Sequence, residues 1–294
     1  MEKAKVIFTK EITPEAVVRM YEALGRELRG KVAVKMSTGE SKKSNHLRPE
    51  FVAPIVNRLN GTIVECCTAY GGSRQEIRKH WAAIEERGFK KVAPVEIMDE
   101  FGEFEIPVEG GVHLDTDIVG TGLKNYDSVL ILSHFKGHVM GGFGGALKNI
   151  SIGIASSHGK AKIHSAGVTI DTQKCWGECK PKQDDFLESM AEACKGVLDY
   201  VGRENMAYIN VANRLSVDCD CDGDPHEPEM ADIGIFASLD PVAIDQACVD
   251  AVYASADPGK KALIERMESR HGIHTVERAA EIGVGTREYE LIEL

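Results

Sequence analysis

The feature of this chain that most constrains its fold is the run Ser128–Ser133 (SVLILS), whose four central residues are all apolar. A strand with one face in water alternates apolar and polar side chains, whereas a strand buried on both faces is continuously apolar. Sheets that are buried on both faces are mostly parallel and are covered by helices. The run therefore predicts an interior strand of an α/β sheet.

Segments with the composition of strands alternate along the chain with segments of helical periodicity. The other predicted strands are Lys5–Phe8, Lys31–Lys35, Thr62–Cys66, Met206–Ala212 and Ile233–Ala237, with a strand pair in Glu103–His113 joined at Gly110-Gly111. The predicted helices lie in Thr13–Leu28, Pro49–Leu59, Ser73–Arg87, Gly141–Ile154 and Asp184–Tyr200, and three more follow from Pro241. This alternation is typical of a mostly parallel sheet flanked by helices. We expect one α/β domain over residues 1–294, whose sheet can form two lobes with the site between them.

Two helix starts are predicted from local side-chain chemistry. Thr13 is a good N-cap, and Pro14 after it suits the first helical position. Ser73 and Glu76 have the spacing of a capping box, in which each side chain binds the backbone N–H of the other.

Charge and hydropathy narrow the classes of function. The chain has a formal net charge of -11 and lacks the basic stripe that a nucleic-acid surface needs. Its apolar runs are far shorter than the roughly 20 residues of a spanning helix, so no membrane association is expected. The start of the chain has no signal-peptide pattern. The cytoplasm is the expected compartment.

The richest segment follows the buried strand and runs from His134 to Asn149 (HFKGHVMGGFGGALKN). Open α/β sheets place ligands at the carboxyl ends of their strands, and N–H groups that open a helix favour an anion. We expect Lys136, Gly144 and Gly145 to bind the anionic groups of a ligand. His134, His138 and Lys148 are the candidate catalytic residues, because imidazoles transfer protons near neutral pH. The alternative is a tight turn whose histidines bind backbone carbonyls.

The segment Ser156–His164 (SSHGKAKIH) is rich in glycine and lysine. We expect a mobile arm that closes over the site, with His164 as a metal ligand. The alternative is that His158 and His164 are simply exposed.

Of the eight cysteines, three lie in apolar or helical patterns, and four lie in polar, turn-rich segments and are candidate ligands, namely Cys175, Cys179, Cys219 and Cys221. Cys66, Cys194 and Cys248 lie in apolar or helical patterns and are expected in the core. A disulfide framework is not expected in a reducing compartment. Cys219 and Cys221 lie in a polar loop, where alternate side chains of extended backbone share one face, so they are candidate ligands of a soft metal. The alternative is a pair of thiols that meet by chance.

Several of these motifs together resemble the domain-of-unknown-function family 362. They are SHFKGHVMGGFGGALKNISIG, HGKAKIHS, the CDC loop and SLDPVAIDQACVD. Many members carry an inserted ferredoxin segment, and the corresponding position, residues 171–205, keeps only Cys175 and Cys179 of its motifs. The resemblance therefore implies a degenerate ferredoxin insert.

A more distant resemblance connects the same residues with the nickel-pincer lactate racemases. In their pattern a lysine tethers the cofactor, a later histidine ligates nickel and an earlier histidine is a catalytic base. The residues in those places are Lys148, His164 and His138. The second base of the racemases has Ser73 in its place, and Arg74 beside it is expected to bind a carboxylate.

These observations predict a metal- or iron–sulfur-associated enzyme of the redox type that acts on a small anionic substrate. Iron and nickel are the expected metals, and a nickel-pincer-type cofactor is one form they can take. One alternative is a non-enzymatic electron-transfer or metal-carrier protein with a redox protein as its partner. The other is an anion- or nucleotide-binding module without a metal.

Overall fold

The computed structural model describes residues 3–177 and 179–294. Within that part of the chain, eight strands form one sheet in the order β12-β1-β11-β10-β7-β2-β3-β4. In chain order they are β1 Ala4–Thr9, β2 Val32–Lys35, β3 Thr62–Glu65, β4 Val95–Ile97, β7 Ser128–His134, β10 Met206–Ala212, β11 Gly234–Ser238 and β12 Tyr289–Glu293. Two small hairpins lie outside this sheet, namely β5 Glu103–Pro107 with β6 Thr116–Gly120 and β8 Lys136–His138 with β9 Gly142–Gly144.

Five of the seven neighbouring strand pairs in the large sheet are parallel, and only β11 runs against its two neighbours. The predicted mostly parallel α/β sheet is therefore confirmed. All seven residues of β7 are buried, as the continuous apolar run predicted.

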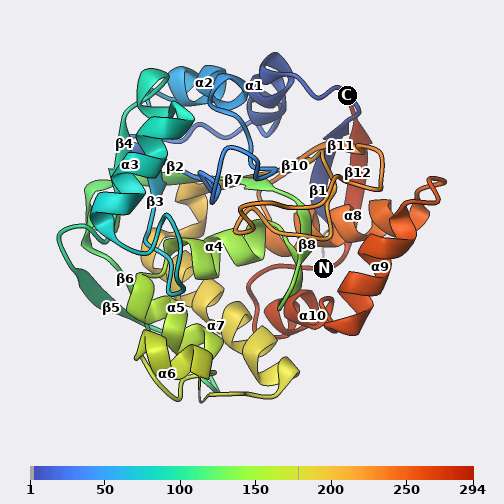
Figure 1. Cartoon of the computed structure of the whole chain (residues 1–294). Coiled ribbons are helices and arrows are strands. Elements are labelled where there is room, and N and C mark those ends of the chain that lie inside the picture. The colour runs from blue at the N-terminus through green and yellow to red at the C-terminus, as the bar shows by residue number, and fades with distance from the viewer. Residues whose placement is uncertain (1–2, 178) are drawn as a thin grey trace.

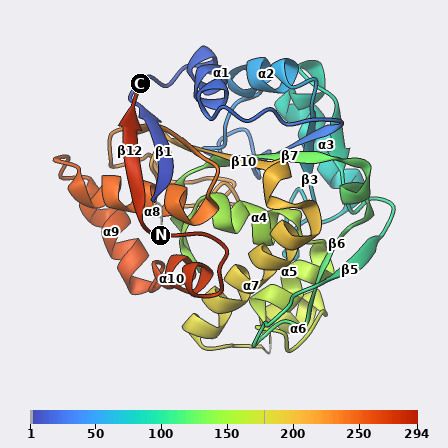
Figure 2. The same cartoon turned by 180° about the vertical axis from the view of Figure 1, so that it is seen from behind.

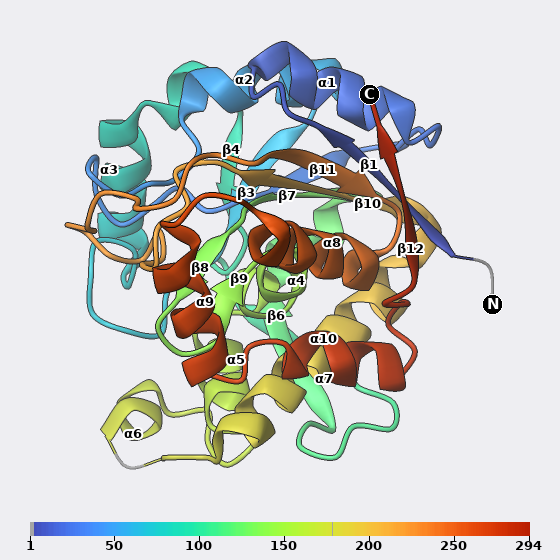
Figure 3. The ribbon, with the colours of Figure 1, turned by 90° about the vertical axis from the view of Figure 1, so that its right-hand side faces the viewer.

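Helices cover both faces of the sheet, which is seen edge-on in Figure 3. One face carries α1 Pro14–Ala23, α2 Pro49–Arg58 and α3 Ile77–Arg87 (Figure 1). The other carries α4 Ala146–Ile154, α5 Ser157–His164, α7 Gln183–Val201, α8 Pro241–Ala254, α9 Lys260–Ser269 and α10 His274–Glu281 (Figure 2). The short α6 Thr172–Gly177 follows α5, and three 3-10 turns lie at Phe89–Lys91, Thr121–Asn125 and Arg203–Asn205. Each face has its own apolar core.

The two predicted helix starts have different outcomes. Thr13 caps α1 by accepting a hydrogen bond from the N–H of Ala16 at 3.1 Å, so that prediction is confirmed. The capping box is wrong, because α3 begins only at Ile77 and the Ser73 hydroxyl donates to the Glu40 carbonyl at 2.7 Å. Ser73 thus bonds to Glu40, which is distant in the sequence, and not to the nearby Glu76.

The predicted mobile arm is also wrong. Its residues form α5, which Ser156 caps by accepting from the N–H of Gly159 at 3.1 Å. Gly159 packs against β6 so closely that a Cβ there would lie 2.0 Å from the Ile118 carbonyl oxygen. Lys160 and His164 are buried with it. The segment is therefore a packed helix in the wall of the molecule.

Smaller predictions are corrected or confirmed in the same way. The helix α1 ends at Ala23, before Gly25 with its positive φ of 64°, and does not reach the predicted Leu28. The second strand of the predicted pair begins at Thr116. The three core cysteines are buried as expected. No helix of the described residues is both long and apolar enough to cross a membrane.

The strand order changes direction between β2 and β7. From β2 the chain adds β3 and then β4 towards one edge, whereas β7 is followed by β10 towards the other edge. Open parallel sheets bind ligands outside the carboxyl ends of the strands at such a point, because the connections diverge there and leave a crevice.

Candidate functional site

A cavity of about 420 Å³ lies at that point of the sheet. Its wall includes Lys35, Glu65, Arg74, Ser133, His134, Lys136, His138, Gly144, Gly145, Lys148, Asn149, Lys160, His164, Cys219, Asp220 and Cys221. All ten residues that the sequence analysis selected as catalytic, anion-binding or metal-binding are in this wall. The structure thus brings together the glycine turn, α5 and the CDC loop, although these lie far apart in the sequence.

Positive charge is in excess around the cavity. Its lining contains five Lys or Arg side chains and two carboxylates, Glu65 and Asp220. This excess contrasts with the net charge of -11 of the whole chain. Because walls of low dielectric focus the potential of one sign, the cavity attracts anions.

Of these cationic side chains, Lys148 has the fewest polar partners. No hydrogen bond or ion pair joins its Nζ to any other residue that the structure describes. Burial, together with the charge of Lys136, lowers the pKa of Lys148 to about 7. Near neutral pH the amine is therefore partly unprotonated, and in that form it is a nucleophile or a proton acceptor.

Lys136 and His134, by contrast, hold an acidic residue of the CDC loop. Asp220 lies with one carboxylate oxygen 2.8 Å from His134 Nδ1 and the other 3.1 Å from Lys136 Nζ. Although burial opposes ionisation, Lys136 and His134 hold the pKa of Asp220 well below its usual range. The second ring nitrogen of His134 lies 2.6 Å from the Asn213 carbonyl oxygen. Both nitrogens of His134 face acceptors, which favours an anchoring role over the predicted catalytic one.

His138 differs from His134, because one of its ring nitrogens accepts hydrogen bonds from backbone N–H groups. Its Nδ1 accepts the backbone N–H groups of Met140 and Gly141 at 3.3 and 2.9 Å. Burial and the charges of Lys148 and Lys136 hold the pKa of His138 well below its usual range, so the ring is neutral. Its single proton is then on Nε2, because Nδ1 is an acceptor. A neutral imidazole of this kind donates a hydrogen bond and is a poor base.

In His164 the roles of the two ring nitrogens are reversed relative to His138. Its Nδ1 donates to the Lys160 carbonyl at 2.6 Å, which leaves the lone pair on Nε2. Burial lowers the pKa of His164 to about 4, and the ring stacks on Phe186 with centroids 5.3 Å apart. Histidines that bind metals are oriented in this way, with the other ring nitrogen donating to a carbonyl.

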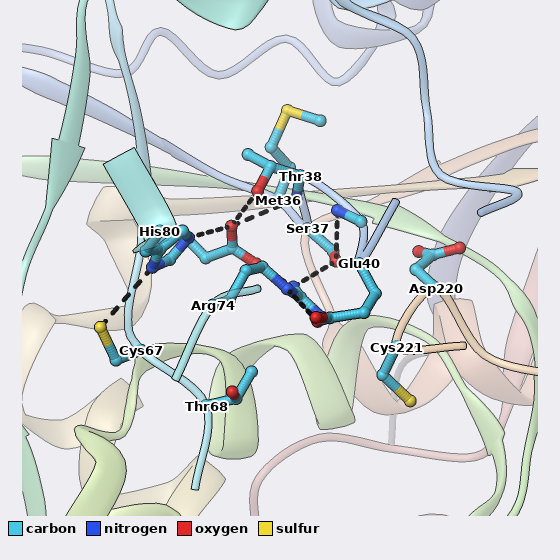
Figure 4. Close-up of polar contacts among 12 residues, drawn as sticks. Met36, Ser37, Thr38, Glu40, Cys67, Thr68, Arg74, His80, Asp220 and Cys221 are labelled. Atoms are coloured by element: carbon cyan, nitrogen blue, oxygen red, sulfur yellow. Dashed lines mark hydrogen bonds and ion pairs between the residues drawn. The ribbon is translucent and has the colours of Figure 1, made fainter. Parts of the chain in front are cut away.

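Arg74 is already occupied by acidic partners of the protein, as Figure 4 shows. Its Nη1 donates to Glu65 at 2.6 Å and its Nε to Glu40 at 3.2 Å. Glu65 also accepts from Thr38 and contacts His80 at 3.1 Å. Although burial opposes ionisation, Arg74 and His80 hold the pKa of Glu65 well below its usual range. This network favours a structural role for Arg74 over the predicted binding of a substrate carboxylate.

Other parts of the chain lie so close to the glycine turn that a side chain would not fit at Gly142. Gly142 has a φ of 77°, and a Cβ there would lie 2.8 Å from the Cα of Gly272. At the start of α4 the N–H groups of Ala146 and Leu147 donate to Asp245 at 2.7 and 3.0 Å. The anion that we expected at this helix start is therefore a carboxylate of the chain itself.

Cys219 and Cys221 are joined in a disulfide, which the sequence analysis did not expect. Metals are bound by thiolates, so neither sulfur is a ligand in this form. A ring nitrogen of His138 lies within 4.8 Å of both sulfur atoms, a spacing that a metal ion could bridge if the thiols were free. Cys175 is buried and Cys179 half-buried, and both are free thiols. Glu178 between them lies outside the described residues.

A model of one protein family matches residues 32–250 of this chain, which is most of its length. The family is described as a domain of unknown function, DUF362. The chain belongs to this family. The resemblance found in its motifs is thus confirmed for DUF362, whose description assigns no activity.

Comparison of this DUF362 protein with solved structures finds two distant matches. The apoprotein of lactate racemase from Thermoanaerobacterium thermosaccharolyticum is 15% identical, with a TM-score of 0.47, and the match covers 84% of this chain and 56% of the racemase chain. A protein from Thermotoga maritima is 13% identical, with a TM-score of 0.44, over 91% of this chain and 58% of the other. The chain thus spans under two thirds of the length of either. The comparison with curated proteins gives no match.

The sequence analysis missed several residues that line or position the site of this DUF362 protein, among them Lys35, Asn149 and Asp245. Lys35, at the carboxyl end of β2, donates to Asn149 at 3.0 Å, and burial lowers its pKa to about 8. Asn149 in turn donates to the Leu132 and Lys35 carbonyls at 3.2 and 3.1 Å, so it ties β7 to β2. Asp245 caps α4. The sequence did offer a signal for Lys35, because this lysine ends a predicted strand. The capping of α4 by Asp245 joins residues that are far apart in the sequence, so no local pattern indicated it.

Proposed function

We propose that this protein is a metal-dependent enzyme that acts on a small anionic molecule in the cavity. The observation that carries the proposal is Lys148, a half-buried residue whose amine has no bonding partner among the described residues, in a cavity with three more cations than carboxylates. A charge that is partly desolvated without a partner is costly to the folded protein. An anion bound beside Lys148 would remove that cost and return the amine to its charged form.

Binding of small anions tests this part of the proposal. We expect di- and tricarboxylates or phosphate to raise the melting temperature and to give measurable heat in calorimetry. Lys148→Met should abolish the effect. Lys261→Met, which removes an exposed lysine on α9, is the matched control and should bind as the wild type does. Equal binding by wild type and Lys148→Met would contradict the proposal.

The metal part of the proposal depends on His164. It lines the cavity and its Nδ1 donates to the Lys160 carbonyl, and we assign its ring as the first ligand, with Cys219 and Cys221 of the same cavity wall as further ligands after reduction. An amine such as Lys148 also suits the covalent attachment of a cofactor that contains the metal. When bound, the metal would supply Lewis-acid or redox chemistry.

Elemental analysis of anaerobically purified protein tests the metal. We expect iron or nickel near one equivalent, and its loss in His164→Gln but not in His158→Gln. His158 lies on the same helix, half-exposed, and contacts Glu103 at 2.8 Å. A metal-free protein whose stability is unchanged by chelators would contradict this assignment. If anions bind in such a protein, the second candidate holds, an anion-binding module without a metal, because the excess of cations is sufficient for it.

A further inference from the structure

The disulfide Cys219–Cys221 is part of the cavity wall and does not lie in the apolar core. Both cysteines line the cavity, but they differ in access: Cys219 is buried and Cys221 is half-buried. Figure 4 shows the Cys221 and Asp220 side chains leaving the loop in different directions. A molecule in the cavity therefore meets the sulfur of Cys221 more readily than that of Cys219.

The two sulfurs also differ in their polar environment. The backbone N–H of Cys221 donates to Cys219 Sγ at 3.1 Å. A hydrogen bond to sulfur stabilises the thiolate, so Cys219 is the better leaving group of the pair. A ring nitrogen of His138 lies within 4.8 Å of both sulfur atoms.

We propose that Cys219 and Cys221 are a thiol–disulfide exchange site for small anionic thiols. The inference rests on the proposed binding of anions in the same cavity and names the chemical class of one ligand, a thiol that carries carboxylates. Lys136 and Lys148 line the cavity from the glycine turn. Cations in a partly desolvated site favour both the thiolate of the ligand and its carboxylates.

The exchange is balanced as two steps. The thiolate of the ligand attacks Cys221 Sγ, the bond between the two protein sulfurs breaks, and its electron pair stays on Cys219 Sγ. A second thiolate of the ligand then attacks the ligand sulfur of the mixed disulfide and releases Cys221 as a thiolate. Two ligand thiols are thereby oxidised to one ligand disulfide, and the protein disulfide is reduced to a dithiol, which two protons complete. The reverse reaction oxidises the dithiol.

The first test uses the wild-type chain and compares two thiols. The oxidised protein is mixed with reduced glutathione, which carries net negative charge, or with 2-mercaptoethanol, which is neutral, at equal thiolate concentration. Alkylation and mass spectrometry then measure how fast the disulfide opens. We expect glutathione to react about tenfold faster, and high salt to reduce the difference. Equal rates, or free thiols at both cysteines after treatment with oxidised glutathione, would overturn the inference.

The second test separates the two sulfurs in a background with Cys175→Ser and Cys179→Ser, which removes the two free cysteines of the segment that follows α5. Adding Cys219→Ser leaves Cys221, and adding Cys221→Ser leaves Cys219. With oxidised glutathione, Cys221 should form the mixed disulfide about tenfold faster than Cys219. The opposite order would contradict the assigned roles. Thermal unfolding verifies that each variant is folded.

Failure of this inference can be told from failure of the proposed function. Binding of phosphate or of carboxylates without sulfur by the wild-type chain involves no exchange and depends on the cations alone. If that binding is observed while the sulfur exchange shows no preference for the anionic thiol, only the exchange site is refuted. If both are absent, the anionic cavity ligand is refuted too.

Discussion

Gly145 and Asp245 lie in such close contact that a Cβ on the glycine would fall 2.3 Å from a carboxylate oxygen of the aspartate. The same carboxylate accepts the first N–H groups of α4 and the side-chain amide of Asn210 at 2.7 Å. The glycine turn is therefore fixed to α8 and to β10 at once, and the position of Lys148 one turn further on depends on this contact.

Gly145→Ala should consequently destabilise the protein. The added methyl group collides with Asp245, which cannot move without losing its hydrogen bonds, and we expect a loss of about 2 kcal/mol in the free energy of unfolding. Urea denaturation measures it. Gly71→Ala is the control, because its Cβ would lie 3.9 Å from the nearest atom, an oxygen of Gln75. Similar changes in both variants would argue against the described packing.

Gly144→Ala, one residue earlier, should affect binding and not folding. Its Cβ would lie 3.3 Å from Lys148 Cδ and 3.7 Å from Lys136 Nζ, at the cavity wall. We expect small anions to bind about tenfold more weakly, with a change in unfolding free energy near 0.5 kcal/mol. Calorimetry and urea denaturation of the same sample separate the two effects. Unchanged affinity would mean that the ligand lies elsewhere in the cavity.

Lys148→Met should make the ligand-free protein more stable, and more so at low pH. The folded-state pKa of Lys148 is lowered to about 7, whereas in the unfolded chain it is about 10.4. Between these values the unfolded chain holds a proton that the folded chain has released, so this lysine makes stability rise with pH. Below about pH 7 the amine is charged in the folded protein, and its destabilising effect is then complete. The gain in melting temperature from Lys148→Met should therefore be largest near pH 6 and shrink towards pH 9. A gain that is independent of pH, or one that Lys261→Met reproduces, would disagree with the lowered pKa.

Arg74→Met tests whether Arg74 is structural. Removing the guanidinium leaves Glu65 buried without its 2.6 Å partner, and we expect a loss of about 3 kcal/mol in unfolding free energy. Arg78→Met, at an exposed position of α3, should change stability by less than about 0.5 kcal/mol. If Arg74→Met were as stable as the wild type but bound anions weakly, the original prediction of a substrate-binding Arg74 would be the better one.

The sheet could be predicted well because its strands carry their own signal. The apolar run of β7 and the alternation of strands and helices depend on residues that are neighbours in sequence. That Lys148 and Cys221 line one cavity followed from two local facts, since both come after predicted strands and strand ends gather at one edge of a sheet.

What sequence reasoning missed depends on partners far along the chain. The carboxylate of Asp245 is 99 residues from the N–H of Ala146 that it accepts, and Ser73 binds Glu40 in place of its neighbour Glu76. Lys160 and His164 gave α5 a polar composition that is typical of exposed segments. Their burial is possible because backbone carbonyls accept the Lys160 amine and the His164 ring, and no local pattern reveals this.

The strand order has a consequence for how this protein can be studied. Lys35 comes from an early strand, Lys148 from the middle of the chain and Asp220 from a late loop, whose carbonyl accepts the N–H of Glu40 at 2.8 Å. The residues of the pocket span Lys35 to Cys221, so a chain truncated within this range lacks part of the pocket and should be unable to recognise an anion even if it keeps its secondary structure. Ligand recognition thus reports that strands from the early, middle and late parts of the chain have assembled, and its recovery after denaturation should follow the formation of secondary structure.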